Sequence, residues 1–191
     1  PSHLDKDHGL MSLTDLEIYN NSQLEDPSAA LKAMPSLISI NLSQNNPNWT
    51  SEQANALLHS LAGEDSRSAK KIQILYMNNS NLTKVDGRVL RSMTSLGLLN
   101  LADNKISEVT AFGKDINLVQ LHLSNNQITE LKRGENGEPF CGMADVETFS
   151  FRNNKIEVFP DIFDANSTYG MASVDFSYNN IKRFEGYDEK G

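Results

Sequence analysis

The sequence predicts an α/β fold in which short parallel strands stack into a right-handed solenoid. A curved parallel sheet is expected on the concave face, with helical, 3-10 and irregular segments on the convex face. Two observations support this prediction: one apolar motif recurs seven times, and an asparagine follows it at a fixed position in six of the copies. Such units must stack, because one alone cannot bury its apolar side chains.

The recurring motif has the form Leu-x-x-Leu-x-Leu-x-x-Asn-x-Leu. Its clearest copies run from Leu96 to Ile106 and from Leu118 to Ile128, and other apolar residues replace leucine elsewhere. The seven copies begin at Leu13, Leu37, Ile72, Leu96, Leu118, Val146 and Met171. Apart from two steps lengthened by insertions, the spacing falls within the ~20–29 residues of a short strand-and-return unit.

Alternation within the motif predicts which side chains form the core. Side chains of a strand point to opposite faces in turn, so Leu99 and Leu101 face one side while Leu98 and Asn100 face the other. The two motif positions that Leu99 and Leu101 occupy are apolar in every copy. We therefore expect this pair to point inward and to join a continuous core through the stack.

The repeated asparagine lies where the chain turns away from the sheet and backbone groups lose their partners. Its amide both donates and accepts, so it can bond the backbone of its own turn and of the next. We expect a structural asparagine ladder of Asn21, Asn45, Asn104, Asn126, Asn154 and Asn179. Serine replaces asparagine at Ser80 and offers fewer hydrogen bonds, which predicts a local irregularity there.

Apolar residues also recur at three-residue steps outside the strands, and we expect them to point inward from the convex returns. They are Leu31, Met34 and Leu37, then Leu90, Met93 and Leu96, and later Val109, Leu131, Phe159 and Phe184. Strands stack at about 4.8 Å, whereas packed helices need about 8–10 Å. The stack should therefore bend with its strands on the inside of the curve.

Over roughly residues 10–184 the motif resembles the leucine-rich-repeat superfamily, and its long period resembles the typical and SDS22-like classes. The segment Phe159-Pro160-x-Ile162-Phe163 is similar to the return of the typical class. The resemblance implies a protein-interaction role without naming a partner. Asparagine-rich turns without disulfide caps resemble bacterial surface repeats, which implies an extracellular or envelope location, with the cytoplasm as the alternative.

Two insertions lengthen the repeats. Residues 50–63 predict an amphipathic helix, because Thr50 to Gln53 form a capping box and Ala54, Leu57, Leu58 and Leu61 share one face. Glycine and proline in residues 132–143 predict a projecting loop, the other candidate binding site, with Phe140 packing back onto the solenoid. The lone Cys141 has no neighbouring His or Cys for metal binding or nucleophilic catalysis.

Composition limits the partners. The net charge of −8 disfavours nucleic acid and anionic membrane surfaces. No apolar run approaches the ~20 residues that span a bilayer, and one cysteine excludes an intrachain disulfide. We expect residues 1–191 to form one monomeric domain. Because no cap is recognisable after residue 184, we expect a fragment of a longer protein.

The outward strand positions predict a binding patch on the concave face. Ile74, Tyr76 and Leu98 are apolar at solvent-facing positions, and polar side chains follow them on the neighbouring strands. Apolar anchors within a polar rim are typical of protein interfaces. The predicted partner-binding residues are Ile74, Tyr76, Leu98, Asn100, Gln120, His122 and Arg152. Acidic residues at both ends, Asp15, Glu17 and Asp175, favour a partner with basic rim residues.

An enzymatic reading of the same face has little support. His122 lies near Ser124 and Ser150, but a flat exposed sheet offers no oxyanion pocket, so we predict no catalytic residue, metal or cofactor. Two other hypotheses remain beside the binding module. In the first, the chain is a structural spacer in a larger surface protein. In the second, it is a targeting or regulatory domain of an enzyme outside this chain. The apolar patch counts against a spacer.

Overall fold

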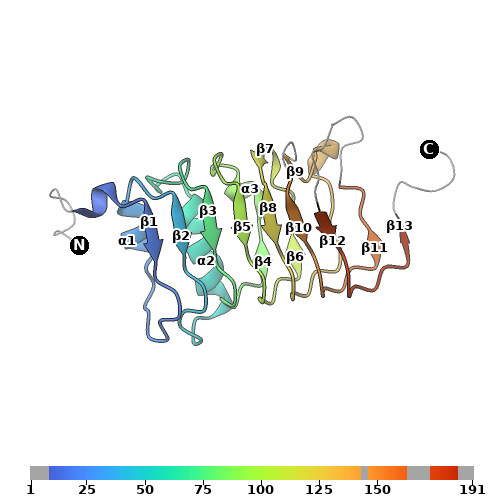
Figure 1. The fold of residues 1–191 in the computed structure, drawn as a ribbon, viewed down its shortest axis with the longest axis horizontal. Helices are drawn as coiled ribbons and strands as arrows, with labels where there is room; N and C mark the ends of the chain where they lie inside the picture. Colours follow the sequence, from blue (N-terminus) through green and yellow to red (C-terminus); the bar gives the residue numbers. More distant parts are fainter. Residues whose placement is uncertain (1–8, 143–145, 163–172, 185–191) are drawn as a thin grey trace.

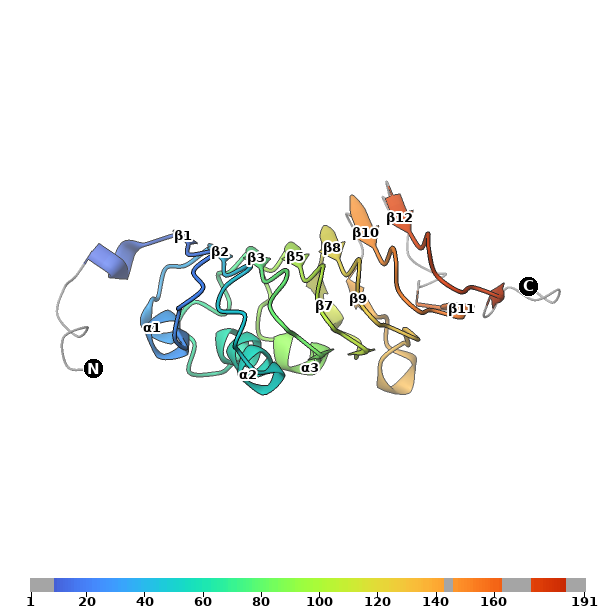
Figure 2. The ribbon, with the colours of Figure 1, turned by 90° about the horizontal axis from the view of Figure 1, so that it is seen from below.

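The computed structural model describes residues 9–142, 146–162 and 173–184. The molecule is elongated, and its strands follow one another along the long axis from β1 (Asp15–Glu17) toward one end to β13 (Arg183–Phe184) toward the other (Figure 1). Seen after a quarter turn, the sheet occupies one long side, and the helices α1 (Ser28–Ala33), α2 (Ser51–Ala62) and α3 (Gly87–Leu90) lie along the other (Figure 2). This two-sided arrangement is the one that the repeat predicts.

One sheet of seven strands forms the spine of the fold, and every neighbouring pair in it is parallel. In spatial order the strands are β1 (Asp15–Glu17), β2 (Ser39–Asn41), β3 (Ile74–Tyr76), β5 (Leu98–Asn100), β8 (Gln120–His122), β10 (Thr148–Ser150) and β12 (Ser173–Asp175). Spatial order follows sequence order, so each repeat contacts only its neighbours in the sheet. The predicted solenoid of parallel strands is confirmed.

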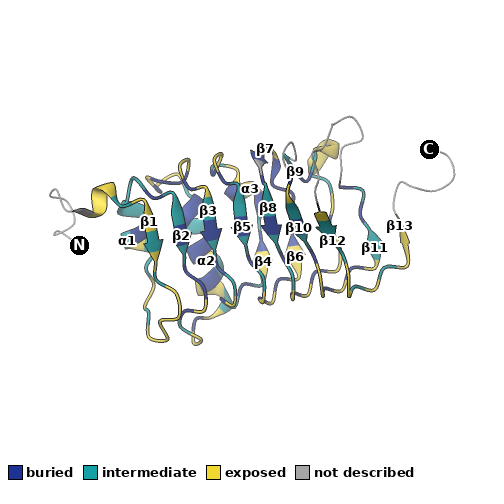
Figure 3. Ribbon diagram, viewed as in Figure 1, coloured by how far each residue is buried: buried dark blue, intermediate teal, exposed yellow. Residues whose placement is uncertain are grey.

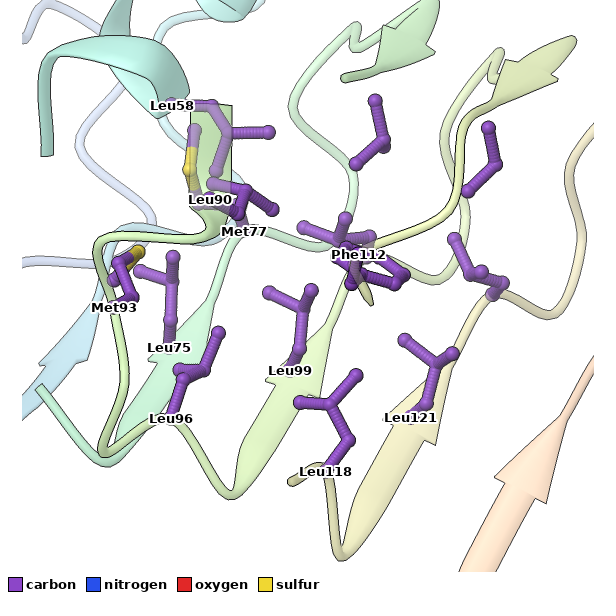
Figure 4. Close-up of a cluster of buried hydrophobic side chains, with 14 of the residues drawn as sticks. Leu58, Leu75, Met77, Leu90, Met93, Leu96, Leu99, Phe112, Leu118 and Leu121 are labelled. Atoms are coloured by element: carbon purple, nitrogen blue, oxygen red, sulfur yellow. The ribbon is translucent and has the colours of Figure 1, made fainter. Parts of the chain in front are cut away.

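The core consists of the inward motif positions stacked in register. Leu75, Leu99 and Leu121 pair across three adjacent strands, and all three are fully buried. Figure 4 shows them beside side chains from the return segments, among them Met93 and Phe112. Colouring by burial shows the same contrast along the chain, with buried strand positions in the middle of the solenoid and exposed residues in its turns (Figure 3).

Short helices and two-stranded sheets are the other regular elements of the described fold. The helical segments are η1 (Gly9–Ser12), α1 (Ser28–Ala33), α2 (Ser51–Ala62), α3 (Gly87–Leu90) and η2 (Glu135–Gly137). The two-stranded parallel sheets pair β4 (Lys84–Val85) with β6 (Glu108–Val109), β7 (Gly113–Asn117) with β9 (Cys141–Gly142), and β11 (Val158–Phe159) with β13 (Arg183–Phe184).

Helix α2 is capped as its sequence predicts. The Thr50 hydroxyl accepts a hydrogen bond from Gln53 N at 3.2 Å, and Gln53 Oε1 accepts one from Thr50 N at 2.8 Å. Its apolar face, including Leu57 and Leu58, is buried in the core. Gly63 ends the helix with a φ of −66°, so the left-handed conformation open to glycine is not used there.

The return segments confirm most of the predicted inward positions and correct one. Val109 and Leu131 are buried, and Phe159 is half-buried. Phe184, expected to point inward, is instead 58% exposed. It belongs to the last described repeat and stacks on Phe159, with ring centroids 4.7 Å apart. The prediction was wrong because burial at this position depends on a following repeat, and no described repeat packs beyond β13.

Five of the six motif asparagines bond across neighbouring repeats from the turns after the strands: Asn45, Asn104, Asn126, Asn154 and Asn179. Asn21, in the first repeat, does not meet the expectation, because it is exposed and its Nδ2 donates to Tyr19 O of its own turn. Asn126 is typical of the five: its Oδ1 accepts from Ile106 N of the preceding repeat at 2.9 Å. Its Nδ2 donates to Leu101 O at 3.1 Å and to Leu123 O at 3.0 Å. These bonds satisfy buried backbone groups that have left the ladder of the sheet.

The irregularity expected at Ser80 is confined to the turn, because β3 keeps its register with both neighbours. Ser80 is buried, and its hydroxyl donates to Asn78 O at 3.2 Å. In other repeats a backbone amide of the preceding repeat donates to the motif asparagine, as Ile106 N does to Asn126. The equivalent residue in the repeat before Ser80 is Pro47, which has no N–H. Serine in place of asparagine therefore leaves no backbone donor unsatisfied at this position.

A second row of side chains, which the sequence analysis did not identify, lies beside the motif asparagines. The residue immediately before each motif asparagine, or before Ser80, has a positive φ between 51° and 59°. Most of these residues are asparagine or aspartate, which tolerate the left-handed conformation. Asn125 Nδ2 donates to Asp103 Oδ1 at 2.7 Å, and Asn153 Nδ2 donates to Asn125 Oδ1 at 2.9 Å. This exposed row links three consecutive repeats.

Candidate functional site

Six of the seven predicted binding residues lie together on the outward face of the sheet. Strand register places Ile74, Leu98 and Gln120 in one row. The next row contains Tyr76, Asn100 and His122 on the same three strands. All six are half-buried, so each presents part of its side chain to solvent. We call this group of six the concave patch.

Local hydrogen bonds orient the two amides of the concave patch. Asn100 Oδ1 accepts from Ala102 N at 3.1 Å, and Gln120 Nε2 donates to Glu147 Oε2 at 2.9 Å. Fixed polar groups beside apolar anchors lose less conformational entropy on binding than free ones. The patch is therefore partly preorganised.

His122 is not set up as a general base by its neighbours. Burial lowers the pKa of its imidazole from the ordinary value of 6.5, so the ring is neutral at pH 7. The two serine hydroxyls considered as its partners bond each other instead, with Ser124 Oγ and Ser150 Oγ 2.7 Å apart. Among the described residues, the Ser–His pair conceivable from sequence does not form.

Arg152, the seventh predicted residue, is held away from the concave patch. Its guanidinium lies 4.0 Å from the centroid of the Tyr178 ring and donates to Ser177 Oγ at 2.6 Å. Both partners belong to the last described repeat. The pKa of Asp175 is lowered first by its hydrogen bonds from Ser177 and also by the charge of Arg152. Arg152 and Asp175 thus form a separate charged group at the C-terminal edge.

Sequence reasoning missed a pocket on the side of the molecule away from the sheet, although it marked the 132–143 insertion. The pocket has a volume of about 440 Å³, which is within the usual range for ligand sites. We call it the outer pocket. It is lined by Arg88, Arg91, Ser107, Glu108, Val109, Thr110, Ala111, Thr129, Glu130, Lys132, Arg133, Gly134, Glu135, Asn136 and Glu138. The mixture of acidic and basic residues in 130–138 was its only sequence signal.

The insertion that closes this pocket is anchored at its end. As expected, Phe140 packs back onto the solenoid: it is fully buried, and its ring meets that of Phe112 edge-on at 5.4 Å. Arg91 donates to Phe112 O at 3.2 Å and forms an ion pair of 3.1 Å with Glu138. Burial raises the pKa of the neighbouring Cys141 thiol, which disfavours the reactive thiolate.

Metal-binding clusters and membrane-spanning helices are both absent from the described ranges 9–142, 146–162 and 173–184. No group of three or more His, Cys, Asp or Glu side chains in these ranges is placed to hold a metal ion. No helix in these ranges is long and apolar enough to cross a membrane.

Comparisons with known proteins agree with the architecture. Two family models described as leucine-rich repeat match residues 70–128 and 117–143. The chain is 38% identical to a leucine-rich repeat protein from Bacteroides eggerthii, with a TM-score of 0.70 over 83% of this chain and 26% of that one. For a leucine-rich repeat protein from Bacteroides thetaiotaomicron the identity is 38% and the TM-score 0.72, over 90% and 20%.

Among curated proteins, lumican from Gallus gallus and from Coturnix japonica is 29% identical over 157 residues, or 80% of this chain. The chain spans 39% of the length of these relatives. Together with the repeat and the sheet, these matches define the class of fold: the chain is a leucine-rich-repeat solenoid and is similar to proteins of the leucine-rich-repeat superfamily. Domains of this superfamily are generally protein-interaction modules.

Proposed function

We propose that the chain is a non-catalytic module that binds a partner protein through its concave face. The observation that carries the proposal is the concave patch, in which Ile74, Tyr76 and Leu98 form a half-exposed apolar group on adjacent strands. The amides of Asn100 and Gln120 lie beside it at fixed orientations. A few buried residues, with tyrosine prominent among them, contribute most of the binding free energy of a typical protein interface.

Charge around the concave patch supports a partner with basic residues at its rim. On the N-terminal side, Glu17 and Asp15 are exposed, and Asn41 Nδ2 donates to Glu17 Oε2 at 3.1 Å. On the C-terminal side, Glu147 is exposed and accepts from Gln120. Complementary rim charges raise the rate of association and help to set orientation.

The setting of this module is part of the same proposal. We infer a monomeric domain in an extracellular or cell-envelope protein, with a cytoplasmic protein as the alternative. The bacterial origin of the two solved relatives and the absence of disulfides favour a bacterial protein. Fractionation of cells expressing the full-length gene, with detection of this domain in each fraction, separates the two locations.

The function is tested by capture of proteins from surface extracts on the immobilised chain. We expect the unmodified chain to retain a partner that a Tyr76→Ala/Leu98→Ala variant loses. The matched control is Tyr19→Ala/Leu10→Ala, which removes the same two residue types from exposed positions outside the concave patch. Unchanged circular dichroism and thermal midpoints establish that both variants are folded.

Each outcome of this experiment decides between named hypotheses. Loss of the partner only with the Tyr76/Leu98 variant supports concave-face binding. Retention by both variants rejects the concave patch and moves the interface to the 132–143 insertion or the convex side. Absence of any partner favours the spacer over the binding module.

A further inference from the structure

The outer pocket is lined by four cations and four carboxylates, and two further carboxylates, Asp86 and Asp161, pair with its cations from outside the lining. Arg88 contacts Asp86 with two parallel hydrogen bonds, Nε to Oδ1 and Nη2 to Oδ2, each 3.0 Å long. Glu135 approaches the same guanidinium at 3.9 Å. The pKa of Arg88 is raised first by its hydrogen bond to Asp86, and the charges of Glu135 and Glu108 also raise it. One guanidinium therefore faces three carboxylates.

The remaining cations of the outer pocket already have carboxylate partners within the chain. These pairs are Arg91 with Glu138 at 3.1 Å, Lys132 with Glu130 at 2.8 Å, and Arg133 with Asp161 at 3.2 Å. Across the described part of the chain no ion pair includes Glu108, although Lys84 is its register partner on β4. The carboxylates of Glu108 and Glu135 are thus the charges of the pocket that an incoming group can satisfy.

The pocket also offers apolar surface beside these carboxylates. Val109 and Ala111 line it and are otherwise buried, at 7% and 6% exposure. Arginine and lysine bury their aliphatic stems along apolar surface while the charged head stays among polar groups. A volume of about 440 Å³ accommodates such a side chain together with part of the backbone that carries it.

An open strand edge beside the pocket favours a peptide over an isolated amine. Strand β6, which contains Glu108 and Val109, pairs with β4 on one side. On its other side lie residues 129–133, and no strand of the described fold includes them. The backbone of β6 therefore has an edge without a strand partner. Extended peptides commonly bind proteins along such an edge, with alternate side chains entering adjacent pockets.

From these observations we propose that the outer pocket is a second binding site, separate from the concave face. Its ligand is an arginine or lysine side chain carried by an extended segment of a partner protein. Glu108 and Glu135 bind the charged head, Val109 and Ala111 contact the stem, and the ion pair between Arg91 and Glu138 holds the wall of the site in place.

The test is a titration of the ¹⁵N-labelled 191-residue chain with an acetylated, amidated tetra-arginine peptide, followed by NMR at low salt. We expect the amide signals of Val109, Ala111 and Gly134 to move with a saturating dependence on peptide. A Glu108→Gln/Glu135→Gln variant should bind at least about tenfold more weakly, because it removes the two charges that the peptide satisfies. Both side chains are exposed, so the variant is expected to fold.

The matched control is Glu64→Gln/Asp65→Asn, which removes two carboxylates from exposed positions in the loop after α2. Its affinity for the peptide should stay within about twofold of the unmodified chain, because these charges lie outside the outer pocket. Equal weakening in the two variants would show only attraction to an acidic protein and would overturn the proposal. The proposal also fails if the signals of Tyr76 and Asn100 move while those of Val109 and Ala111 do not.

Discussion

Replacement of Asn104 by alanine removes the acceptor of two buried amides at once. Its Oδ1 accepts from Ser80 N at 2.8 Å and from Leu82 N at 3.1 Å. Its Nδ2 donates to Met77 O at 2.9 Å and to Leu101 O at 3.0 Å. Alanine leaves both amides unsatisfied, and an unsatisfied buried donor costs about 1–3 kcal/mol. We expect Asn104→Ala to lower the free energy of unfolding by about 2–6 kcal/mol.

The same substitution at Asn126 should cost about half as much. Its Oδ1 accepts from one amide, Ile106 N. The carbonyl Leu101 O, to which its Nδ2 donates, also accepts from Asn104 and remains satisfied. We expect Asn126→Ala to cost about 1–3 kcal/mol, for the single unsatisfied amide.

A control in the neighbouring turn position separates burial from the mere loss of an amide side chain. Asn125 is exposed and has a φ of 57°. Asn125→Gly keeps that backbone conformation accessible and removes only exposed hydrogen bonds, so its cost should stay below about 1 kcal/mol.

Urea denaturation of the three variants, followed by circular dichroism with a common m-value, gives the comparison. The reasoning predicts the order Asn104→Ala, Asn126→Ala, Asn125→Gly from most to least destabilised. If Asn104→Ala costs less than about 1 kcal/mol, or no more than Asn125→Gly, the turn amides do not depend on the asparagines.

Three further predictions concern the core, the thiol and the histidine. Leu99→Ala, at a fully buried position, should cost about 2–5 kcal/mol in the same assay and far more than Leu98→Ala on the outward face; equal costs would contradict the assigned facing of β5. Cys141 is buried and its pKa is raised, so iodoacetamide should alkylate it only after urea unfolds the chain. Rapid labelling of the folded protein would show that the insertion does not bury this thiol. Burial lowers the pKa of His122 in the folded state, so the unfolded chain binds more protons as the pH drops through 6.5. The free energy of unfolding should therefore fall over this range of pH. Titration of the His122 ring followed by NMR should give a pKa below 6.5, and a higher value would refute this assignment.

Short-range alternation was sufficient to predict the central features of the fold. The spacing of Leu99 and Leu101 on one face, repeated seven times, determines both the sheet and its core. The helix at residues 51–62 followed from a capping box and an apolar face, which are local signals. The concave patch followed from the same alternation, since outward positions on adjacent strands meet once the register is known.

Features that depend on particular neighbours could not be predicted in this way. Arg152 occupies an outward position, but Tyr178 and Ser177 hold its guanidinium toward the last repeat. The exposure of Phe184 depends on what packs beyond it. Pattern alone does not determine either contact.

The outer pocket could not be predicted either, because it depends on contacts between segments that are far apart in the sequence. It joins Arg88 in one repeat with Glu108 in the next and Glu135 in an insertion. The charges of 130–138 were visible in the sequence, but their meeting with α3 required the path of the insertion. That path depends on Phe140 packing against Phe112, a contact between segments of different repeats.

The central claim is that the concave face is the binding surface. Methyl NMR of the chain with and without the captured partner tests it most directly. Ile74 and Leu98 report on the concave patch, and Val109 reports on the outer pocket. Concave-face binding predicts that the methyl signals of Ile74 and Leu98 shift or broaden as the partner is added. Unchanged signals from both residues at saturating partner would contradict it.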